Sequence, residues 1–291
     1  MNHQTRYLLL YHPLQAKAQL KAIRLQLHAL SYAYVEVATS GDFYADLQGL
    51  QAYIPNTKRV IALGGDGTLN LAANAFAHSE VEVALVPCGS GNDFARQWRR
   101  SEQQWIEAAL THVSSAIDLG KVNERYFVNV AGVGYDAAVV AASQNKRGRW
   151  AHLNYAWQGI KMLYRYAPSL LQFSTTKNST IKKQEQRLLM MCLANGRYFG
   201  GGMCLAPKAN ISDGQLSCVQ IGAAPFWRQI QALILSYFAA HTRLKQVNIA
   251  PVSELDVHTA NIGIEADGEY IGTTPALFSV QRGALNFVMP V

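Results

Sequence analysis

The residues with the clearest chemical potential form a glycine-rich segment, Gly64-Gly65-Asp66-Gly67-Thr68-Leu69-Asn70. It follows an apolar run at 59–63 and precedes a predicted helix at 68–77, which is the context of a phosphate-binding loop. Glycines let phosphate oxygens approach the backbone amides, and the positive end of the helix would attract the same anion. Asp66 is unsuited to touching phosphate, so we expect its carboxylate to hold Mg²⁺ or to accept a proton. No G-x-x-x-x-G-K-[ST] spacing occurs, which excludes Walker-type chemistry.

The elements that must position this loop follow from alternating strand and helix periods in the first 118 residues. Strands are predicted at 7–11, 34–38, 59–63 and 83–86, and helices at 18–30, 43–50 and 68–77. A further helix follows Ser101, where Gln104 completes a capping box. This alternation predicts a parallel sheet flanked by helices, whose ligands bind at the carboxyl ends of the strands. Because Asp66 and Asp93 would end adjacent strands, their carboxylates could share a Mg²⁺ ion, although Asp93 could also simply cap a helix.

The pattern changes after Asp118 to short β-rich runs separated by turn residues. These runs lie at 126–131, 170–175, 188–194, 216–221, 262–266 and 285–289, with helical stretches at 151–166 and 226–242. We therefore predict two domains, a nucleotide-binding α/β domain at 1–118 and a mostly antiparallel β domain at 119–291.

Composition narrows the class of protein. The 291 residues are 49% hydrophobic and 15% charged, which indicates a folded chain with a large core. A net charge of +7 favours anionic partners such as phosphates, nucleotides or a membrane surface. The longest unbroken apolar run is far shorter than a membrane helix needs, and the four cysteines show no metal-finger spacing. These features predict a soluble cytoplasmic protein, and no motif supports nucleic-acid binding.

Residues 64–68 resemble the phosphate-binding motif shared by diacylglycerol kinases, sphingosine kinases, NAD kinases and, more distantly, phosphofructokinases. The segment Pro87–Ala95 looks like the second signature of the diacylglycerol kinase catalytic domain, which NAD kinases lack. Further matching segments cover nearly the whole chain, namely Asp118–Asn123, Phe127–Asp136, Asn195–Met203, Ala206–Gly214 and Glu265–Glu269. The layout is similar to that of bacterial soluble lipid kinases, which implies an NAD-kinase-like or phosphofructokinase-like first domain. It also implies that the second domain, at 119–291, is a β-sandwich that binds the lipid substrate.

The resemblance implies an ATP- and Mg²⁺-dependent lipid kinase whose active site lies in the cleft between the domains. Diacylglycerol or a related glycerolipid or sphingoid lipid is the expected acceptor. Nucleotide contacts would come from Thr39, Gly64, Gly65, Asp66, Gly67, Thr68, Leu69, Asn70, Ser90 and Asp93. In the second domain, Glu269 is the expected general base for the lipid hydroxyl, with Asp267 as the close second, although Asp-Gly-Glu is also an ordinary hairpin signal. Asp213, with the carbonyl groups of Asn210 and Gln215, matches a structural Mg²⁺ loop.

Two features leave alternatives open. The family usually opens with Asn-Pro and a glycine-containing loop, whereas this chain has the glycine-free His12–Lys17, which puts the part of that loop in ATP binding in doubt. This loop leaves open a non-catalytic, nucleotide-regulated membrane-surface protein. A NAD kinase is a second alternative because it shares the first motif and a two-domain plan, although the Ser90–Asp93 signature argues against it. A homodimer is also left open. Cations and aromatics at 146–150 and 155–166, and again at 226–228, suit transient contact with an anionic membrane or ordinary packing on the sheet.

Overall fold

The computed structural model describes residues 6–143, 159–177 and 179–290 of the chain. The chain divides into two compact units, unit 1 with Met1–Leu119 and Arg282–Val291, and unit 2 with Gly120–Gln281. The sequence prediction had placed 282–291 in the second domain. These residues belong to unit 1 because Asn286 and Phe287 of the last strand pair in parallel with Glu82 and Val83.

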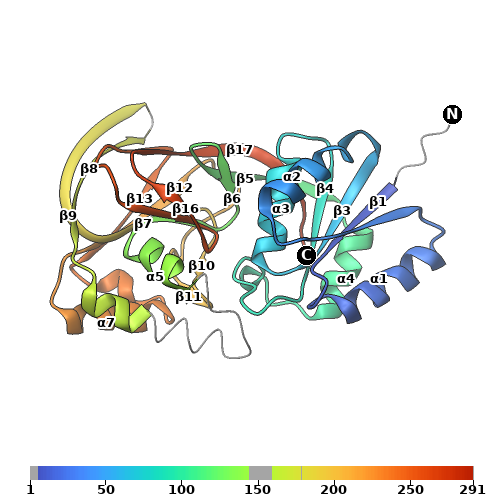
Figure 1. Cartoon of the computed structure of the whole chain (residues 1–291), viewed down its shortest axis with the longest axis horizontal. Helices are drawn as coiled ribbons and strands as arrows, with labels where there is room; N and C mark the ends of the chain where they lie inside the picture. Colours follow the sequence, from blue (N-terminus) through green and yellow to red (C-terminus); the bar gives the residue numbers. More distant parts are fainter. Residues whose placement is uncertain (1–5, 144–158, 178, 291) are drawn as a thin grey trace. The chain divides into compact units, whose positions relative to one another are not determined.

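Unit 1 is built around a parallel sheet in the order β4-β3-β1-β2. Its strands are β1 (Arg6–Tyr11), β2 (Tyr34–Ala38), β3 (Thr57–Gly64) and β4 (Glu82–Pro87). Its helices are α1 (Lys17–Ala29), α2 (Phe43–Gln51), α3 (Asp66–Phe76) and α4 (Glu102–Thr111), with short 3₁₀ turns at Ile54–Asn56 and Ala95–Gln97. Figure 1 shows α1 and α4 on one face of this sheet and α2 and α3 on the other. The parallel α/β fold predicted for the first domain is confirmed.

The strands of unit 1 carry apolar side chains on both faces, as expected for a sheet covered by helices on each side. Leu9, Ile61 and Ala84 pack in one cluster with side chains of α1 and α4. The alternate positions on the same strands, such as Leu8 and Val60, are equally buried. The predicted capping box at the start of α4 is present, with Ser101 and Gln104 bonded reciprocally.

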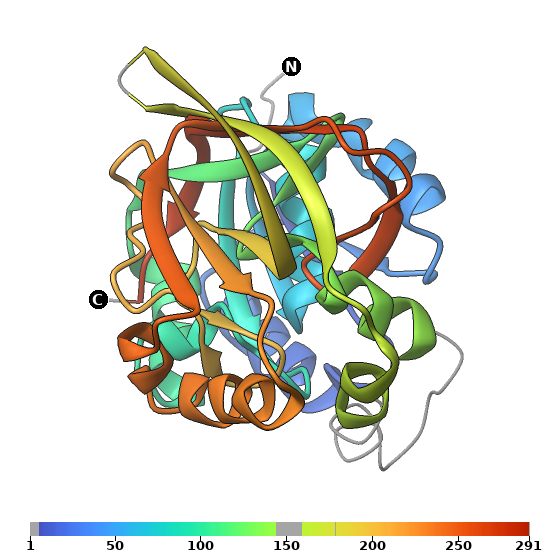
Figure 2. The same cartoon turned by 90° about the vertical axis from the view of Figure 1, so that its left-hand side faces the viewer.

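Unit 2 is mostly antiparallel, as predicted. Its strands are β6 (Arg125–Phe127), β7 (Val130–Gly134), β8 (Ser169–Lys177), β9 (Thr180–Ala194), β10 (Tyr198–Phe199), β11 (Met203–Cys204), β12 (Leu216–Gly222), β13 (Val247–Val252), β14 (Glu254–Val257), β15 (Gly263–Ala266) and β16 (Glu269–Thr273). β5 (Ser114–Val122) and β17 (Ala276–Val288) each contain residues of both units. The central strand β9 pairs with β7, β8 and β12, and β7 pairs with β15. Figure 2 shows the long β8–β9 hairpin extending away from the helices.

Two element predictions in unit 2 need correction, and one helix was missed. The strand predicted at 126–131 is two strands, β6 and β7. The helix predicted at 226–242 ends as α7 (Phe226–Ser236), because Ala239 takes a left-handed conformation before a 3₁₀ turn at Ala240–Arg243. Helix α5 (Tyr135–Ser143) was not predicted.

The helix predicted at 151–166 is described only in its second half. Residues 159–165 are helical, whereas 151–158 of the helix predicted at 151–166, and the basic aromatic segment 146–150, lie outside the described residues. Among the helices that the structure describes, none has the length and apolar character needed to cross a bilayer.

Candidate active site

Four loops of unit 1 meet at the carboxyl edge of its parallel sheet. Past the ends of the strands, backbone hydrogen bonds continue from His12 to Leu63, from Thr39 to Tyr11 and from Cys88 to Gly64, with N···O distances of 2.9–3.0 Å. These bonds hold the segments after β1, β2, β3 and β4 along one edge. The loops along this edge carry all ten predicted nucleotide contacts, namely Thr39, Gly64–Asn70, Ser90 and Asp93.

Glycines allow the two central loops to touch. A Cβ atom on Gly89 would lie 2.4 Å from the Cα atom of Gly65, and one on Gly64 would lie 2.1 Å from Oγ1 of Thr68. A side chain on Gly89 would force the two loops apart, and one on Gly64 would clash with Thr68 within the first loop. Gly65 is also the N-cap of α3 and offers the helix no side-chain cap. The start of α3 thus has the character of an anion-binding helix end.

Asp66 joins the two loops. Its Oδ2 atom accepts the backbone N–H of Asp93 and its Oδ1 atom accepts that of Phe94, both at 3.0 Å. The second loop is further closed by Asn92, whose side chain bonds both the N–H and the carbonyl of Gly89. These contacts give Asp66 a structural role that the sequence did not indicate, beside the metal or proton role predicted for it.

The predicted contacts differ in how accessible their side chains are. Ser90 and Gly67 are exposed and Thr39 is half-buried. Thr68, Leu69 and Asn70 are buried in α3, so Leu69 contributes to the core rather than offering its side chain to a ligand. The buried carboxylate of Asp93 forms an ion pair with Arg96 at 3.1 Å.

The glycine-free loop after β1 is a tight turn. The backbone N–H groups of Gln15 and Ala16 both donate to the carbonyl of His12, and Ala16 is fully buried. The loop therefore leads directly into α1, leaving Leu14 exposed at its tip.

The acidic turn predicted in unit 2 connects β15 to β16. Asp267 and Gly268 have positive φ angles of 46° and 83°, as in a two-residue hairpin turn. The carboxylate of Asp267 accepts three backbone N–H groups, from Val128 at 2.7 Å, Asn129 at 2.9 Å and Val130 at 3.0 Å. Asp267 thus anchors the turn to the segment between β6 and β7.

Glu269 has a different environment from Asp267. Its side chain is 47% exposed, and Oε2 lies 2.5 Å from Nη2 of Arg125, whose side chain is largely buried. Of the two base candidates predicted in this turn, Glu269 is the more exposed. Arg125, the cation that orients it, was not singled out from the sequence.

Two buried carboxyl groups behind this turn were also missed. Glu265 is fully buried, and its Oε2 atom accepts the N–H of Gly268 at 2.9 Å. Burial, together with the nearby charge of Asp136, raises the pKa of Glu265 well above its usual range. Within the described part of the chain, Oε1 of Glu265 has no hydrogen-bond partner. The only sequence signal was an acidic residue inside the apolar run 262–266.

Asp136 occupies space that Gly132 leaves free. Gly132 lies in register between Glu265 on β15 and Cys192 on β9, and a Cβ atom on it would overlap the carboxyl group of Asp136. The thiol of Cys192 donates to Oδ2 of Asp136 at 3.2 Å, and burial raises the pKa of Asp136 to about 6. Asp136 and Glu265 therefore form a buried acidic pair behind the turn.

The predicted metal loop is closed by its own side chains. Oδ1 of Asp213 accepts the N–H of Gln215 at 3.0 Å, and Oδ1 of Asn210 accepts that of Ser212 at 3.1 Å. Among the residues that the structure describes, no three His, Cys, Asp or Glu side chains gather into a metal site. One exposed carboxylate with nearby carbonyl groups still suits Mg²⁺, which keeps several of its waters.

Comparison with known proteins identifies the family. Residues 6–122 match the diacylglycerol kinase catalytic domain, and residues 129–289 match the YegS C-terminal NAD kinase beta sandwich-like domain. A diacylglycerol kinase of Mycobacterium tuberculosis is 26% identical over 249 residues, which cover 82% of this chain and 79% of that protein. One from Staphylococcus aureus is 25% identical over 280 residues, covering 93% of this chain and 88% of that protein.

A solved structure has the same fold. A diacylglycerol kinase from Bacillus anthracis superposes with a TM-score of 0.72 at 18% identity, over 97% of this chain and 96% of that one. The resemblance first seen in the two glycine loops and the acidic turn is therefore confirmed over both units. The chain belongs to the diacylglycerol kinase family with a YegS-type C-terminal domain, and it is a kinase.

Proposed function

We propose that this protein transfers the γ-phosphoryl group of ATP to a hydroxyl group of diacylglycerol or of a related glycerolipid or sphingoid lipid. The observation that carries the proposal is the pair of loops at 64–70 and 87–95, which touch through glycines at the carboxyl edge of the sheet. The relatives that share both domains are named diacylglycerol kinases, which supports a lipid as acceptor.

In this proposal, unit 1 binds the phosphates. The backbone of Gly64–Gly67 and the start of α3 would receive the phosphate oxygens, with the exposed hydroxyl of Ser90 beside them. Asp66 holds the second loop through its two amide bonds, so the geometry of both loops depends on one carboxylate. Asp66 and Asp93 are the carboxylates at this edge that could order the Mg²⁺ accompanying the nucleotide.

Unit 2 would supply the base. Glu269 is exposed enough to meet an acceptor hydroxyl and is oriented by Arg125. Asp267 instead fixes the turn through its three amide bonds, so that Glu269 is held at a defined position. A carboxylate held in this way can accept the hydroxyl proton as the phosphoryl group is transferred.

The net charge of +7 favours transient contact of the enzyme with an anionic bilayer, where a lipid acceptor resides. Asp213, with carbonyl groups of its loop, would hold a second, structural Mg²⁺.

The test is a phosphorylation panel with γ-labelled ATP. Dispersed diacylglycerol, monoacylglycerol and sphingosine are offered separately, and NAD is offered as a soluble acceptor. We expect label in at least one lipid and none in NAD. Label in NAD alone would indicate a NAD kinase, and tight ATP binding without any transfer would indicate a non-catalytic protein.

A further inference from the structure

The acidic turn of unit 2 is bonded to a buried carboxyl group, that of Glu265. Glu265 lies on β15, three positions before Gly268, and its side chain is fully buried. Its Oε2 atom accepts the backbone N–H of Gly268 at 2.9 Å. Glu269, the proposed base, follows Gly268 directly. This hydrogen bond therefore fixes the backbone from which the base projects.

The titratable and charged groups that face Glu265 are acidic or neutral. They are Asp136 on α5, the thiol of Cys192 on β9, Asp267 in the turn and, as strand partner, Tyr270 on β16. Gly132 of β7, the partner on the other side of Glu265, has no side chain. None of these groups is a cation that could balance an ionised carboxylate.

The second oxygen of Glu265 has no hydrogen bond to compensate for burial. In the part of the chain that the structure describes, Oε1 is enclosed and accepts no hydrogen bond. An ionised carboxylate here would be both unpaired and unsolvated, which costs far more than burying a neutral carboxyl group. Burial and the charges of Asp136 and Asp267 accordingly raise the pKa of Glu265 well above its usual range. The geometry therefore favours the protonated side chain.

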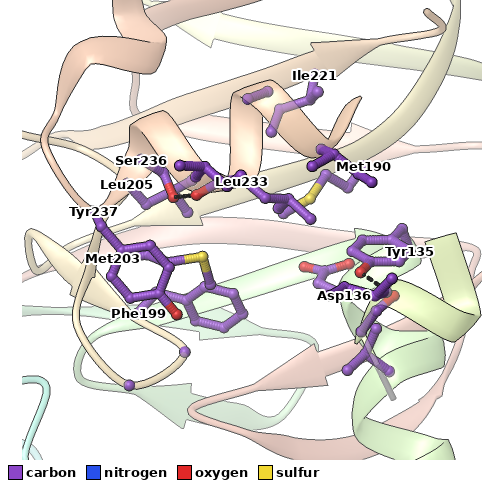
Figure 3. A pocket seen from close by; sticks show the side chains of 18 residues that line it. Tyr135, Asp136, Met190, Phe199, Met203, Leu205, Ile221, Leu233, Ser236 and Tyr237 are labelled. Carbon is purple, nitrogen blue, oxygen red and sulfur yellow. Dashed lines mark hydrogen bonds between the residues drawn. The ribbon is translucent and has the colours of Figure 1, made fainter. Parts of the chain in front are cut away.

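Asp136 adds to this effect. Its carboxyl group fills the space over Gly132, the strand partner of Glu265, and lies at the wall of a cavity lined mainly by apolar side chains (Figure 3). Burial raises the pKa of Asp136 to about 6, so this group is largely ionised at neutral pH. Its negative charge disfavours a second negative charge on Glu265.

We propose that Glu265, in its neutral form, is a positioning residue for transfer, which holds Gly268 and thereby keeps the carboxylate of Glu269 aimed at the acceptor hydroxyl. This inference rests on the proposed function and adds a residue that acts through the base rather than on the substrate. Ionisation of Glu265 would require water at the enclosed Oε1 atom, and admitting water there would loosen the turn.

Substitutions at Glu265 test this role with γ-labelled ATP and dispersed diacylglycerol. Glu265→Gln keeps a neutral acceptor for Gly268 and should retain kcat within about twofold. Glu265→Met has a similar size but accepts no such hydrogen bond, so kcat should fall at least about tenfold while KM for ATP stays unchanged. Gln220→Met is the matched control, because Gln220 is a buried polar residue on β12 that bonds to Asn248 rather than to the turn. It should lose thermal stability without losing kcat.

The pH profile separates a positioning role from a purely structural one. Wild-type kcat should fall as pH rises through the pKa of Glu265, because ionisation loosens the turn. Glu265→Gln has no proton to lose there and should keep its rate over the same alkaline range. A residue with a structural role alone would change the melting temperature without adding a step to the pH profile of kcat.

The backbone amide of Gly268 reports the position of the turn without any substrate. In protein carrying isotope-labelled glycine, nuclear magnetic resonance should show faster exchange of this N–H with water in Glu265→Met than in wild type or Glu265→Gln. Gly222, whose N–H donates to the carbonyl of Gln246 at 2.8 Å, is the internal reference and should be unchanged.

The proposal is overturned if folded Glu265→Met keeps the wild-type kcat, or if Glu265→Gln or Gln220→Met loses as much rate as Glu265→Met. It is equally overturned if Glu265→Gln shows the wild-type step in its pH profile, a comparison that decides the matter should Glu265→Met not fold. If wild type labels no lipid, the proposed reaction fails, and exchange of the Gly268 amide alone decides whether Glu265 holds the turn. Equal exchange in all variants would show that it does not.

Discussion

Asp267 and Glu269 lie two positions apart on one hairpin, yet their carboxylates meet different partners. Asp267 accepts three backbone N–H groups, whereas Glu269 is half exposed and faces Arg125. Glu265, two positions before Asp267, is fully buried and accepts the backbone N–H of Gly268 in the turn. At the scale of single residues, the acidic turn therefore combines an anchor, an accessible carboxylate and a buried support.

Glu269→Gln should lower kcat at least about a hundredfold, because general-base contributions are typically of that size or larger. ATP affinity and melting temperature should stay near wild type, since Gln keeps the shape of the side chain. Asp267→Asn should lower the melting temperature as well, because an amide cannot accept all three N–H groups and unsatisfied groups cost about 1–3 kcal/mol. Steady-state kinetics and thermal melting measure the effects of both turn variants. Glu124→Gln, which changes an exposed carboxylate, is the control. Full activity in both turn variants would remove this turn from catalysis.

Glu265→Gln should change how stability depends on pH. Burial raises the pKa of Glu265 in the folded protein, so above the unfolded value of about 4.3 the folded state binds more protons than the unfolded state. The contribution of Glu265 to the free energy of unfolding of wild type therefore falls as pH rises above that value. Gln has no proton to lose, so the melting temperature of the variant relative to wild type should increase between about pH 4 and pH 7. A constant difference across that range would show that Glu265 is ionised in the fold.

At the scale of elements, the position of the two glycine loops depends on where parallel strands end. β3 and β4 are neighbours in register, with Gly64 opposite Pro87, so the loops that follow them must meet. The contact between Gly65 and Gly89 has no room for a side chain. The sequence showed both loops as motifs, but only the pairing of strands reveals that they touch.

Gly89→Ala should weaken ATP binding at least about tenfold and lower the melting temperature, because overpacking against backbone costs about 1–3 kcal/mol. Gly49→Ala is the matched control, since Gly49 lies in α2 outside these loops and a Cβ atom there would meet no atom within 4 Å. The control should bind ATP nearly as well as wild type and melt at or above its temperature. Calorimetry measures both affinities. Equal affinities in the two variants would mean that the loop contact does not shape the nucleotide site.

Asp213→Ala tests the metal loop. If Asp213 holds a structural Mg²⁺, a chelator should lower the melting temperature of wild type, and the variant should lose most of that response. Asn210→Ala is a suitable comparison, because it removes a side-chain turn bond but keeps the backbone carbonyl group. An identical chelator response in wild type and Asp213→Ala would place the metal elsewhere.

Local patterns predicted unit 1 well, because each of its strands and helices shows its own apolar period. The same patterns missed what depends on distant pairing. The return of β17 to β4 joins residues about two hundred positions apart in sequence. Asp136 and Glu265 come together because Gly132 of β7 pairs with Glu265 of β15 and leaves space for the carboxyl group of Asp136. The end of α7 was missed because a left-handed Ala239 has no sequence signature.

At the scale of the whole molecule, unit 2 is an insertion in unit 1. The chain leaves unit 1 after Leu119 and returns to it at Arg282. The two glycine loops, for which we propose phosphate binding, lie in unit 1, and the acidic turn lies in unit 2. The proposed reaction therefore requires residues from both units in a single chemical step.

The most direct test of this account is transfer of label from γ-labelled ATP to dispersed diacylglycerol, compared among wild type, Gly89→Ala and Glu269→Gln. We predict labelled lipid with wild type, loss of rate with Gly89→Ala that is restored in part by excess ATP, and loss of at least about a hundredfold with Glu269→Gln that ATP does not restore. Wild-type protein that binds ATP yet labels no lipid, or a Glu269→Gln variant that labels lipid at the wild-type rate, would contradict it.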